Sequence, residues 1–134
     1  GEYHVPHGRA NAVLLPYVIK YNSQTPTKFV SWPKYKSFIA DKKYAEIAHA
    51  CGFGGKTTEE SVDNLINAVM KLKDECSMPR SFAECGISEK EYMDKLDDIA
   101  NKAFEDQCTT ANPRLPLVEE IKELMIKAYN GDAV

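Results

Sequence analysis

Apolar residues recur at helical spacing along most of this chain, and this pattern constrains the fold more than any other feature. In the first such segment, residues 8–21, apolar side chains occupy the other faces as well, which predicts a helix buried on nearly all sides and kinked at Pro16. No segment alternates apolar and polar residues long enough to predict a strand, and the short run 28–32 comes nearest. The spacing therefore predicts an all-α, bundle-like fold with five main helices plus short turns.

Capping and breaking residues place the ends of the next two predicted helices. The second helix spans roughly 39–51 and stops at Gly52, which has the backbone freedom that a helix end needs. The third begins at a capping box opened by Thr57, with a glutamate three residues later. It should end near Ser77, because a proline two residues further on blocks continuation.

The rest of the chain is predicted as two more helices and three irregular segments. A capping box opened by Ser88 begins the fourth helix, and the fifth covers roughly 117–129. Residues 78–86 predict a short helical turn closed by glycine, whereas 22–34 and 107–116 predict loops. Two apolar side chains of the first loop are expected to pack on the core: Val30 and Trp32. Three aromatic residues at helical spacing are expected in the core or at its boundary: Tyr92, Phe104 and Tyr129.

Composition excludes several functional classes. A chain of 134 residues can form one domain and bury a real core without disulfide bridges. The formal net charge of −3 argues against nucleic-acid binding as the main role. No stretch has the ~20 apolar residues that cross a membrane. The four cysteines form no close pair of the zinc-binding kind, so they are predicted to be buried or half-buried free thiols in a cytoplasmic protein.

Two histidines, His4 and His7, flank a proline just ahead of the first predicted helix. An imidazole held rigidly at that place is suited to bind a metal ion. A metal site needs three or more protein ligands, however, and nothing near His7 in sequence supplies them. Judged by itself, His7 therefore fits a capping or surface residue better than a ligand. The third histidine, His49, is predicted to lie at the surface or its boundary.

A second candidate segment lies between the last two predicted helices, at residues 106–114. It combines a cysteine, two threonines, an asparagine and an arginine, which could line an active site. The alternative is a structural turn, in which Thr109 and Asn112 satisfy backbone groups and Arg114 pairs with a carboxylate or caps carbonyls. No histidine is near Cys108 in sequence, so a thiolate nucleophile is not indicated.

Together, the two segments resemble the iron-containing alcohol dehydrogenase family. The similarity runs in order along essentially the whole chain, and its motifs are Pro6-His7-Gly8-x-Ala10-Asn11-Ala12, Tyr21-Asn22, Tyr44-Ala45-x-Ile47-Ala48 and Cys108-Thr109-x-x-Asn112-Pro113-Arg114. Further stretches resemble the C-terminal end of the bifunctional aldehyde–alcohol dehydrogenases: Pro26-Thr27-Lys28, Lys43-Tyr44-Ala45-Glu46-Ile47-Ala48 and Ala103-Phe104-x-Asp106-Gln107.

The resemblance implies roles for particular residues. In that family an N-terminal α/β part binds the nicotinamide cofactor, a C-terminal helical part packs against it, and one Asp and three His hold an iron between them. His7 matches the last of these ligands, and the other three would lie upstream of Gly1. Cys108 is implied to line the substrate or nicotinamide pocket, whereas Asn112 and Arg114 are implied to be structural. His4 occupies a position that the family does not use as a ligand.

The resemblance also implies an activity and its partners. Residues 1–134 correspond to the C-terminal helical part of an alcohol dehydrogenase domain, without its cofactor-binding part. The complete enzyme would interconvert acetaldehyde and ethanol by hydride transfer, using NAD and Fe²⁺ (with zinc as the alternative metal), within a bifunctional enzyme that reduces acetyl-CoA to ethanol. Its partners would be the N-terminal half of the same domain, a small alcohol or aldehyde, and further copies in an oligomer or filament.

The isolated chain is expected to be inactive and not to bind iron tightly, because it carries a single matching ligand. Its first helix, without the other half, should leave an apolar patch that favours dimerisation. The alternative is a non-catalytic helical scaffold or interaction module derived from the same family.

Overall fold

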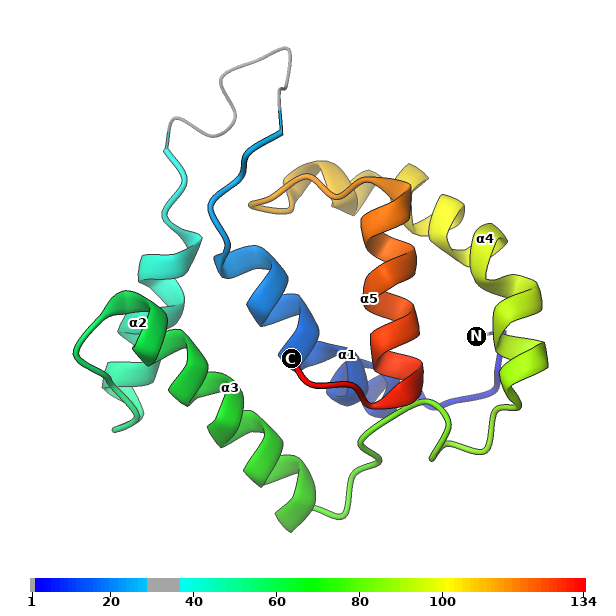
Figure 1. The fold of residues 1–134 in the computed structure, drawn as a ribbon, viewed down its shortest axis with the longest axis horizontal. Helices are drawn as coiled ribbons and strands as arrows, with labels where there is room; N and C mark the ends of the chain where they lie inside the picture. The colour runs from blue at the N-terminus through cyan, green and yellow to red at the C-terminus, as the bar shows by residue number, and fades with distance from the viewer. Residues whose placement is uncertain (1, 29–36) are drawn as a thin grey trace.

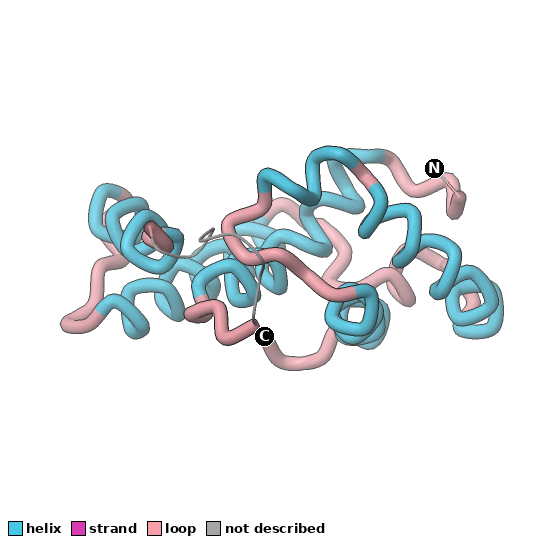
Figure 2. The backbone as a smooth tube through the Cα atoms, turned by 90° about the horizontal axis from the view of Figure 1, so that it is seen from above, coloured by secondary structure: helices cyan, strands magenta, loops and turns pink. Residues whose placement is uncertain are grey.

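The computed structural model describes residues 2–28 and 37–134, and within them the fold is all-helical. Its elements are α1 (His7–Ser23), α2 (Ala40–Ala50), α3 (Thr58–Glu75), α4 (Glu89–Glu105), the short 3₁₀ helix η1 (Gln107–Ala111) and α5 (Val118–Asn130). No strand occurs among these residues, which confirms the predicted fold class (Figure 2). The predicted packing of Val30 and Trp32, and most of the 28–32 strand candidate, fall outside the described residues.

Helix α1 lies between two helical pairs (Figure 1). The pair α2 and α3 packs on one side of it, and α5, which in turn packs against α4, lies on the other. The C-terminal residue Val134 returns to α1 and packs at both hydrophobic clusters of the fold. Helix α1 therefore connects the two halves of the structure, and its position determines how the rest is arranged.

The larger of the two clusters joins α1, α4, α5 and the turn before α4. Its buried members are Val13, Tyr17, Phe82, Ile87, Tyr92, Leu96, Ala128 and Tyr129. The ring of Tyr92 lies at its centre, 5.3 Å from that of Tyr3 and 4.7 Å from that of Tyr129. The hydroxyl of Tyr92 donates to the Met125 carbonyl at 3.1 Å, so the ring is buried with its polar atom satisfied.

Two predictions about the burial of helical residues were wrong. Helix α1 is not buried on nearly all sides: Leu15 keeps 44% of its surface exposed, because the neighbouring helices cover α1 from only two directions. Phe104, expected in the core or at its boundary, is 41% exposed on the last turn of α4. The predictions for Tyr92 and Tyr129 are confirmed, since both rings are buried.

The predicted capping residues act as expected. Thr57 Oγ1 accepts a hydrogen bond from the Glu60 amide at 3.0 Å, and Ser88 Oγ accepts one from the Glu91 amide at 3.3 Å. Helix α3 ends at Glu75, slightly earlier than predicted. These caps explain why the helix starts could be located from sequence, since each involves residues only three positions apart.

The segment 78–86 contains the predicted turn closed by glycine, although the turn does not extend into a regular helix. The Cys85 and Gly86 amides donate to carbonyls three residues back, and Gly86 adopts a positive φ of 84°. The amides of Phe82 and Ala83 instead reach the carbonyls of Ala128 and Tyr129 at 3.1 and 3.3 Å. The last carbonyls of α5 thus accept from two amides that, in a longer helix, would have bonded to a preceding helical turn.

One lysine is buried where an aliphatic residue would be expected. Lys73, on the last turn of α3, is 5% exposed, and its Nζ has no hydrogen-bond partner among the described residues. Burial lowers the pKa of this ammonium below its ordinary value, although the nearby Asp74 and Glu84 carboxylates act in the opposite direction. The charge at this position is therefore a cost to the folded state.

We expect Lys73→Met to raise the free energy of unfolding at neutral pH by about 1–3 kcal/mol, because it removes an unsatisfied buried polar group and keeps the aliphatic volume. Since the folded pKa of Lys73 is lowered, the unfolded chain binds more protons there, and wild-type stability from this group rises with pH. The advantage of the variant should therefore shrink as pH approaches the ordinary lysine pKa. Urea unfolding across alkaline pH measures this, with the exposed Lys71→Met as control; a gain that does not depend on pH would contradict it.

Candidate functional site

A groove of about 610 Å³ runs between α1, α4, η1 and α5. Most of its lining is apolar and includes Val5, Leu14, Val18, Tyr92, Leu124 and Met125. Polar side chains line it near the end of α1, around η1 and at the start of α5: Tyr21, Asn22, Cys108, Thr109, Asn112 and Glu120. An apolar cleft with a few convergent polar groups is the usual form of a small-molecule site, and it is also the form of a surface that another part of a protein covers.

His7 begins α1 and is exposed. Its Nε2 lies 3.0 Å from the Asn11 side-chain nitrogen, one helical turn further on, so the amide orients the imidazole. His4 is also exposed, and its backbone has a positive φ of 54°. His49 is exposed too, as predicted, and its Nε2 lies 3.3 Å from Ser61 Oγ.

The metal-binding potential of this chain rests on His7. Its exposed imidazole is available to serve as one ligand. Across residues 2–28 and 37–134, however, no three histidine, cysteine or acidic side chains gather closely enough to hold an ion. Any complete site of the usual three or more protein ligands therefore needs residues from outside this described part.

The structure separates the two sequence-predicted site residues rather than bringing them together around one point. His7 is at the first turn of α1, and a helix of this length spans about 25 Å. Cys108 is in η1, which continues into a loop tied to the last turn of the same helix. Cys108 lines the groove and is exposed, whereas His7 is not among the lining residues.

The surroundings of Cys108 keep it in the thiol form. The Asp106 carboxylate accepts a hydrogen bond from the Cys108 amide at 2.7 Å. A hydrogen bond to Asp106 and its negative charge raise the pKa of the Cys108 thiol above its ordinary value. This environment agrees with the inference that Cys108 is not a nucleophile. All four cysteines are free, as predicted, but their predicted burial holds only for Cys85, which is half-buried. Cys51, Cys76 and Cys108 are exposed because they lie at helix ends or in the short η1.

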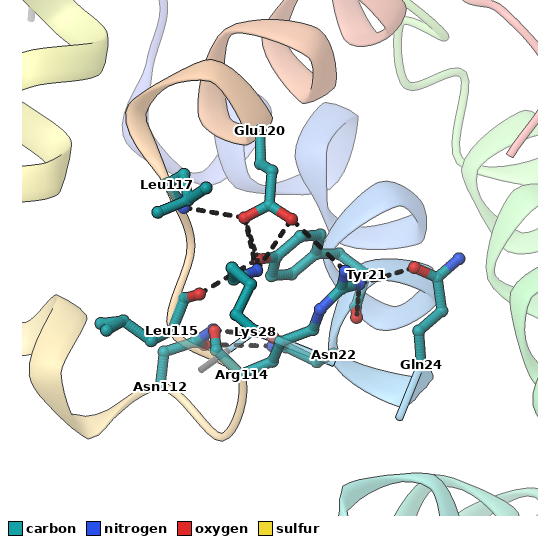
Figure 3. Close-up of polar contacts among 9 residues, drawn as sticks. All are labelled: Tyr21, Asn22, Gln24, Lys28, Asn112, Arg114, Leu115, Leu117 and Glu120. Atoms are coloured by element: carbon teal, nitrogen blue, oxygen red, sulfur yellow. Dashed lines mark hydrogen bonds and ion pairs between the residues drawn. The ribbon is translucent and has the colours of Figure 1, made fainter. Parts of the chain in front are cut away.

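Where α1 ends, a group of polar residues joins three segments of the chain (Figure 3). We call the four central residues the Glu120 cluster: Tyr21, Lys28, Arg114 and Glu120. The Glu120 Oε2 atom accepts from Lys28 Nζ at 2.6 Å and from the Tyr21 hydroxyl at 2.8 Å. The cluster therefore connects the first turn of α5 to the end of α1 and the residues that follow it.

Arg114 completes this cluster. Its guanidinium lies 4.1 Å from the ring centre of Tyr21 and donates to the Tyr21 carbonyl at 3.1 Å. It also donates to Gln24 Oε1 at 2.6 Å and lies 3.4 Å from Glu120 Oε1. Pairing with a carboxylate and capping of a carbonyl were both predicted for Arg114, and both occur.

Two asparagines form a reciprocal pair beside the Glu120 cluster. Asn112 Nδ2 donates to Asn22 Oδ1 at 2.8 Å, and Asn22 Nδ2 donates back at 3.2 Å. Asn22 is only 4% exposed. Asn112 also donates to the Arg114 carbonyl, as expected of a residue that satisfies backbone groups. Thr109 does the same through its bond to the Ala103 carbonyl.

Sequence reasoning missed Glu120 and its partners Tyr21 and Lys28. Glu120 occupies the third position of α5, where it also accepts from the Leu117 amide at 2.8 Å. Burial by itself raises the pKa of Glu120, but hydrogen bonds from Lys28, the Leu117 amide and Tyr21 outweigh it and lower the pKa. A glutamate three residues into a helix could have been read as a capping residue, but nothing local identifies its distant partners.

Comparison with known proteins defines the class. The sequence profile described as the Fe-containing alcohol dehydrogenase family, C-terminal, matches residues 1–129. The chain therefore belongs to the Fe-containing alcohol dehydrogenase family, as the resemblance of its motifs predicted.

Individual relatives agree with this assignment. The chain is 44% identical over 130 residues to an aldehyde-alcohol dehydrogenase of Streptococcus pneumoniae serotype 2, covering 97% of this chain and 15% of that protein. It is 38% identical over 133 residues to the bifunctional aldehyde-alcohol dehydrogenase AdhE of Escherichia coli K12, again covering 97% and 15%. The similarity to bifunctional aldehyde–alcohol dehydrogenases is thus confirmed, and the chain spans about a seventh of their length.

Relatives outside the bifunctional group also match. The NADPH-dependent butanol dehydrogenase of Clostridium saccharobutylicum is 39% identical over 132 residues, which is 98% of this chain and 30% of that protein. The solved iron-containing alcohol dehydrogenase of Thermococcus thioreducens superposes with a TM-score of 0.77 at 35% identity, covering 96% of this chain and 29% of that one. The helical arrangement described above is therefore that of this family.

Proposed function

We propose that residues 1–134 form the C-terminal helical part of an alcohol dehydrogenase domain, within a bifunctional enzyme that reduces acetyl-CoA through acetaldehyde to ethanol. The observation that carries this proposal is the family match over residues 1–129, together with 38–44% identity to bifunctional relatives. In this proposal NAD is the hydride carrier, and the substrate is a small alcohol or aldehyde. The described residues include no helix that could cross a membrane, and we propose that the enzyme works in the cytoplasm.

Two residues of this chain have proposed roles in that reaction. His7 contributes one imidazole to the family's iron, or to zinc in its place, and Asn11 orients that ring. The bound metal ion would supply Lewis acidity toward an alcohol or aldehyde oxygen. Cys108 lines the pocket for the substrate or nicotinamide as a neutral thiol, a role that its place in the groove and its raised pKa support.

The proposed partner of this chain is the cofactor-binding half of the same domain. Two observations support a covering partner: the apolar groove, and exposed large apolar side chains such as Leu15 and Phe104. The bifunctional parent is further proposed to assemble into an oligomer or filament. For the same physical reason, the isolated chain should dimerise through its uncovered apolar surface.

A non-catalytic scaffold derived from the same family is the second candidate. The observation in its favour is that the described residues assemble no complete set of metal ligands. The two candidates differ in what happens when the chain is joined to a cofactor-binding half, so one assay separates them.

We expect the 134-residue chain alone to hold far less than one iron per chain and to show no NADH-dependent reduction of acetaldehyde. The whole protein that carries it should bind iron and turn over, because the missing ligands and the nicotinamide site are then present. Metal analysis and an NADH absorbance assay on both samples measure this. Turnover by the isolated chain would refute the proposed division of the site, and a whole protein without iron or activity would favour the scaffold.

A further inference from the structure

We propose that Glu120 is a positioning residue for the groove: it holds η1, and with it Cys108 and Thr109, against the C-terminal end of α1. This inference rests on the proposed function in one respect only, namely the identity of the molecule that the groove binds. The positioning itself is argued from contacts within this chain, and its failure can be measured separately.

The first step is that η1 has no hydrophobic anchor. None of its five residues is buried. Among the described helices it packs only against α4, which immediately precedes it, and the Thr109 hydroxyl donates to the Ala103 carbonyl at the end of α4. The position of η1 relative to α1 therefore depends on the polar contacts of the residues that follow it, 112–117.

The second step is that these contacts meet at one carboxylate. The two oxygens of Glu120 accept from Lys28 Nζ at 2.6 and 2.8 Å, from the Tyr21 hydroxyl at 2.8 Å and from the Leu117 amide at 2.8 Å. Arg114 Nη2 lies 3.4 Å away. Three of these contacts fall on Oε2 and two on Oε1, and a carboxylate has about four lone-pair positions, so none of these positions is left without a donor.

The third step is that Glu120 balances two cations that are mostly withdrawn from water. The side chains of Lys28 and Arg114 are 19% and 12% exposed, and Glu120 is the acidic residue paired with both. A glutamine at this position offers a single oxygen, and its amide nitrogen would face a donor. Lys28 and Arg114 would then repel each other across the site, and Arg114 would lose its hold on the 112–117 segment.

The fourth step connects this segment to the groove. Asn112 bonds to Asn22 on α1 and, through the same amide, to the Arg114 carbonyl at 2.5 Å. The Asn22–Asn112 pair lines the groove beside Cys108 and Thr109. A displacement of Arg114 therefore also shifts Asn112, which bonds to its carbonyl. The wall of the groove that contains Cys108, four residues before Asn112, then becomes less ordered.

The test measures how accessible Cys108 becomes. The whole protein that carries this chain is labelled with iodoacetamide at one fixed pH, digested with trypsin and analysed by mass spectrometry over time. Cys108 lies alone in the tryptic peptide 103–114, and the exposed Cys51 lies alone in peptide 44–56, which serves as an internal control. Wild type is compared with Glu120→Gln and with Glu119→Gln, a neighbouring carboxylate that is 74% exposed and lies 3.7 Å from Lys122.

Because Cys108 is already exposed, we expect Glu120→Gln to raise its labelling rate only about two- to threefold as the wall of the groove around it loosens, with Cys51 unchanged. Glu119→Gln should label like wild type. An unchanged Cys108 rate in Glu120→Gln would overturn the proposal, and so would an equal rise at Cys51, which would indicate general loosening. If Glu120→Gln does not fold, Tyr21→Phe removes the hydroxyl that donates to Glu120 and accepts from Lys28, and it should give a smaller rise at Cys108 in the same direction. No rise there would also overturn the proposal.

Kinetics of the same variants connect the positioning to function. In Glu120→Gln we expect KM for the alcohol or NAD to rise several-fold while kcat and iron content stay near wild type, because a wall of the groove moves but the metal end of α1 does not. A loss of iron and kcat together would overturn the proposal in favour of a merely structural role. A whole protein without dehydrogenase activity would refute the proposed function, and the Cys108 labelling would still decide whether Glu120 positions η1.

Discussion

Replacing His7 by alanine should abolish alcohol dehydrogenase activity of the whole protein, with a fall in kcat/KM of at least about 100-fold. Loss of even an outer partner of a metal ligand typically costs 10–100-fold, so loss of a ligand itself should cost no less. Iron content should fall with the activity. The measurements are metal analysis and steady-state kinetics on the purified whole protein.

His4→Ala is the matched control for this experiment. His4 is an exposed histidine three residues away, and it is not one of the proposed ligands. It should retain iron and activity within a small factor. If His4→Ala lost iron and His7→Ala kept it, the proposed ligand assignment would be wrong, and His4 would replace His7 in it.

Truncation of Tyr92 to alanine should lower the free energy of unfolding of the 134-residue chain by about 3–5 kcal/mol. The side chain is 1% exposed and contacts the rings of Tyr3, Phe82 and Tyr129, so its loss leaves a cavity at the centre of the larger cluster. A domain of this kind is stable by only about 5–15 kcal/mol, so this loss removes a large share of its stability. Urea unfolding followed by circular dichroism measures the difference.

Two further substitutions show how much of this stability comes from the buried Tyr92 ring. One removes only the hydroxyl of Tyr92, and the other removes an exposed ring on the same helix. Tyr92→Phe keeps the ring and removes the bond to the Met125 carbonyl, and we expect a loss of about 1 kcal/mol. Phe104→Ala removes an aromatic ring from an exposed position on the same helix, and we expect a change of no more than about 0.5 kcal/mol. Equal losses at positions 92 and 104 would show that the larger cluster does not centre on Tyr92.

The sequence predicted most of the local structure because its signals act over short distances. Thr57 and Ser88 cap amides three residues away, and both helix starts were located from that spacing. The turn at 78–86 was located from its closing glycine, but its Phe82 and Ala83 amides bond to Ala128 and Tyr129, more than forty residues further along the chain. A local pattern carries no information about such a partner.

Site residues follow the same division. His7 and Cys108 were identified because they belong to motifs of the Fe-containing alcohol dehydrogenase family, and the role of each remains a proposal. Arg114 was expected to pair with a carboxylate, but the sequence could not say which one. The exposure of Leu15 and Phe104 depends on which helices pack against α1 and α4, and the helical spacing of apolar residues does not indicate those packing partners.

By itself, then, the sequence determined the all-helical class, the starts of the capped helices and the family. Periodicity, capping and motif spacing each depend on residues that are close together in the sequence. Only the tertiary structure decided that α1 joins two helical pairs, that the groove has Cys108 on its wall, and that Glu120 gathers Tyr21 and Lys28 from 99 and 92 residues away. The physical reason is that a half-buried carboxylate is stabilised by whichever donors the fold brings to it, and those donors are neighbours in space without being neighbours in sequence.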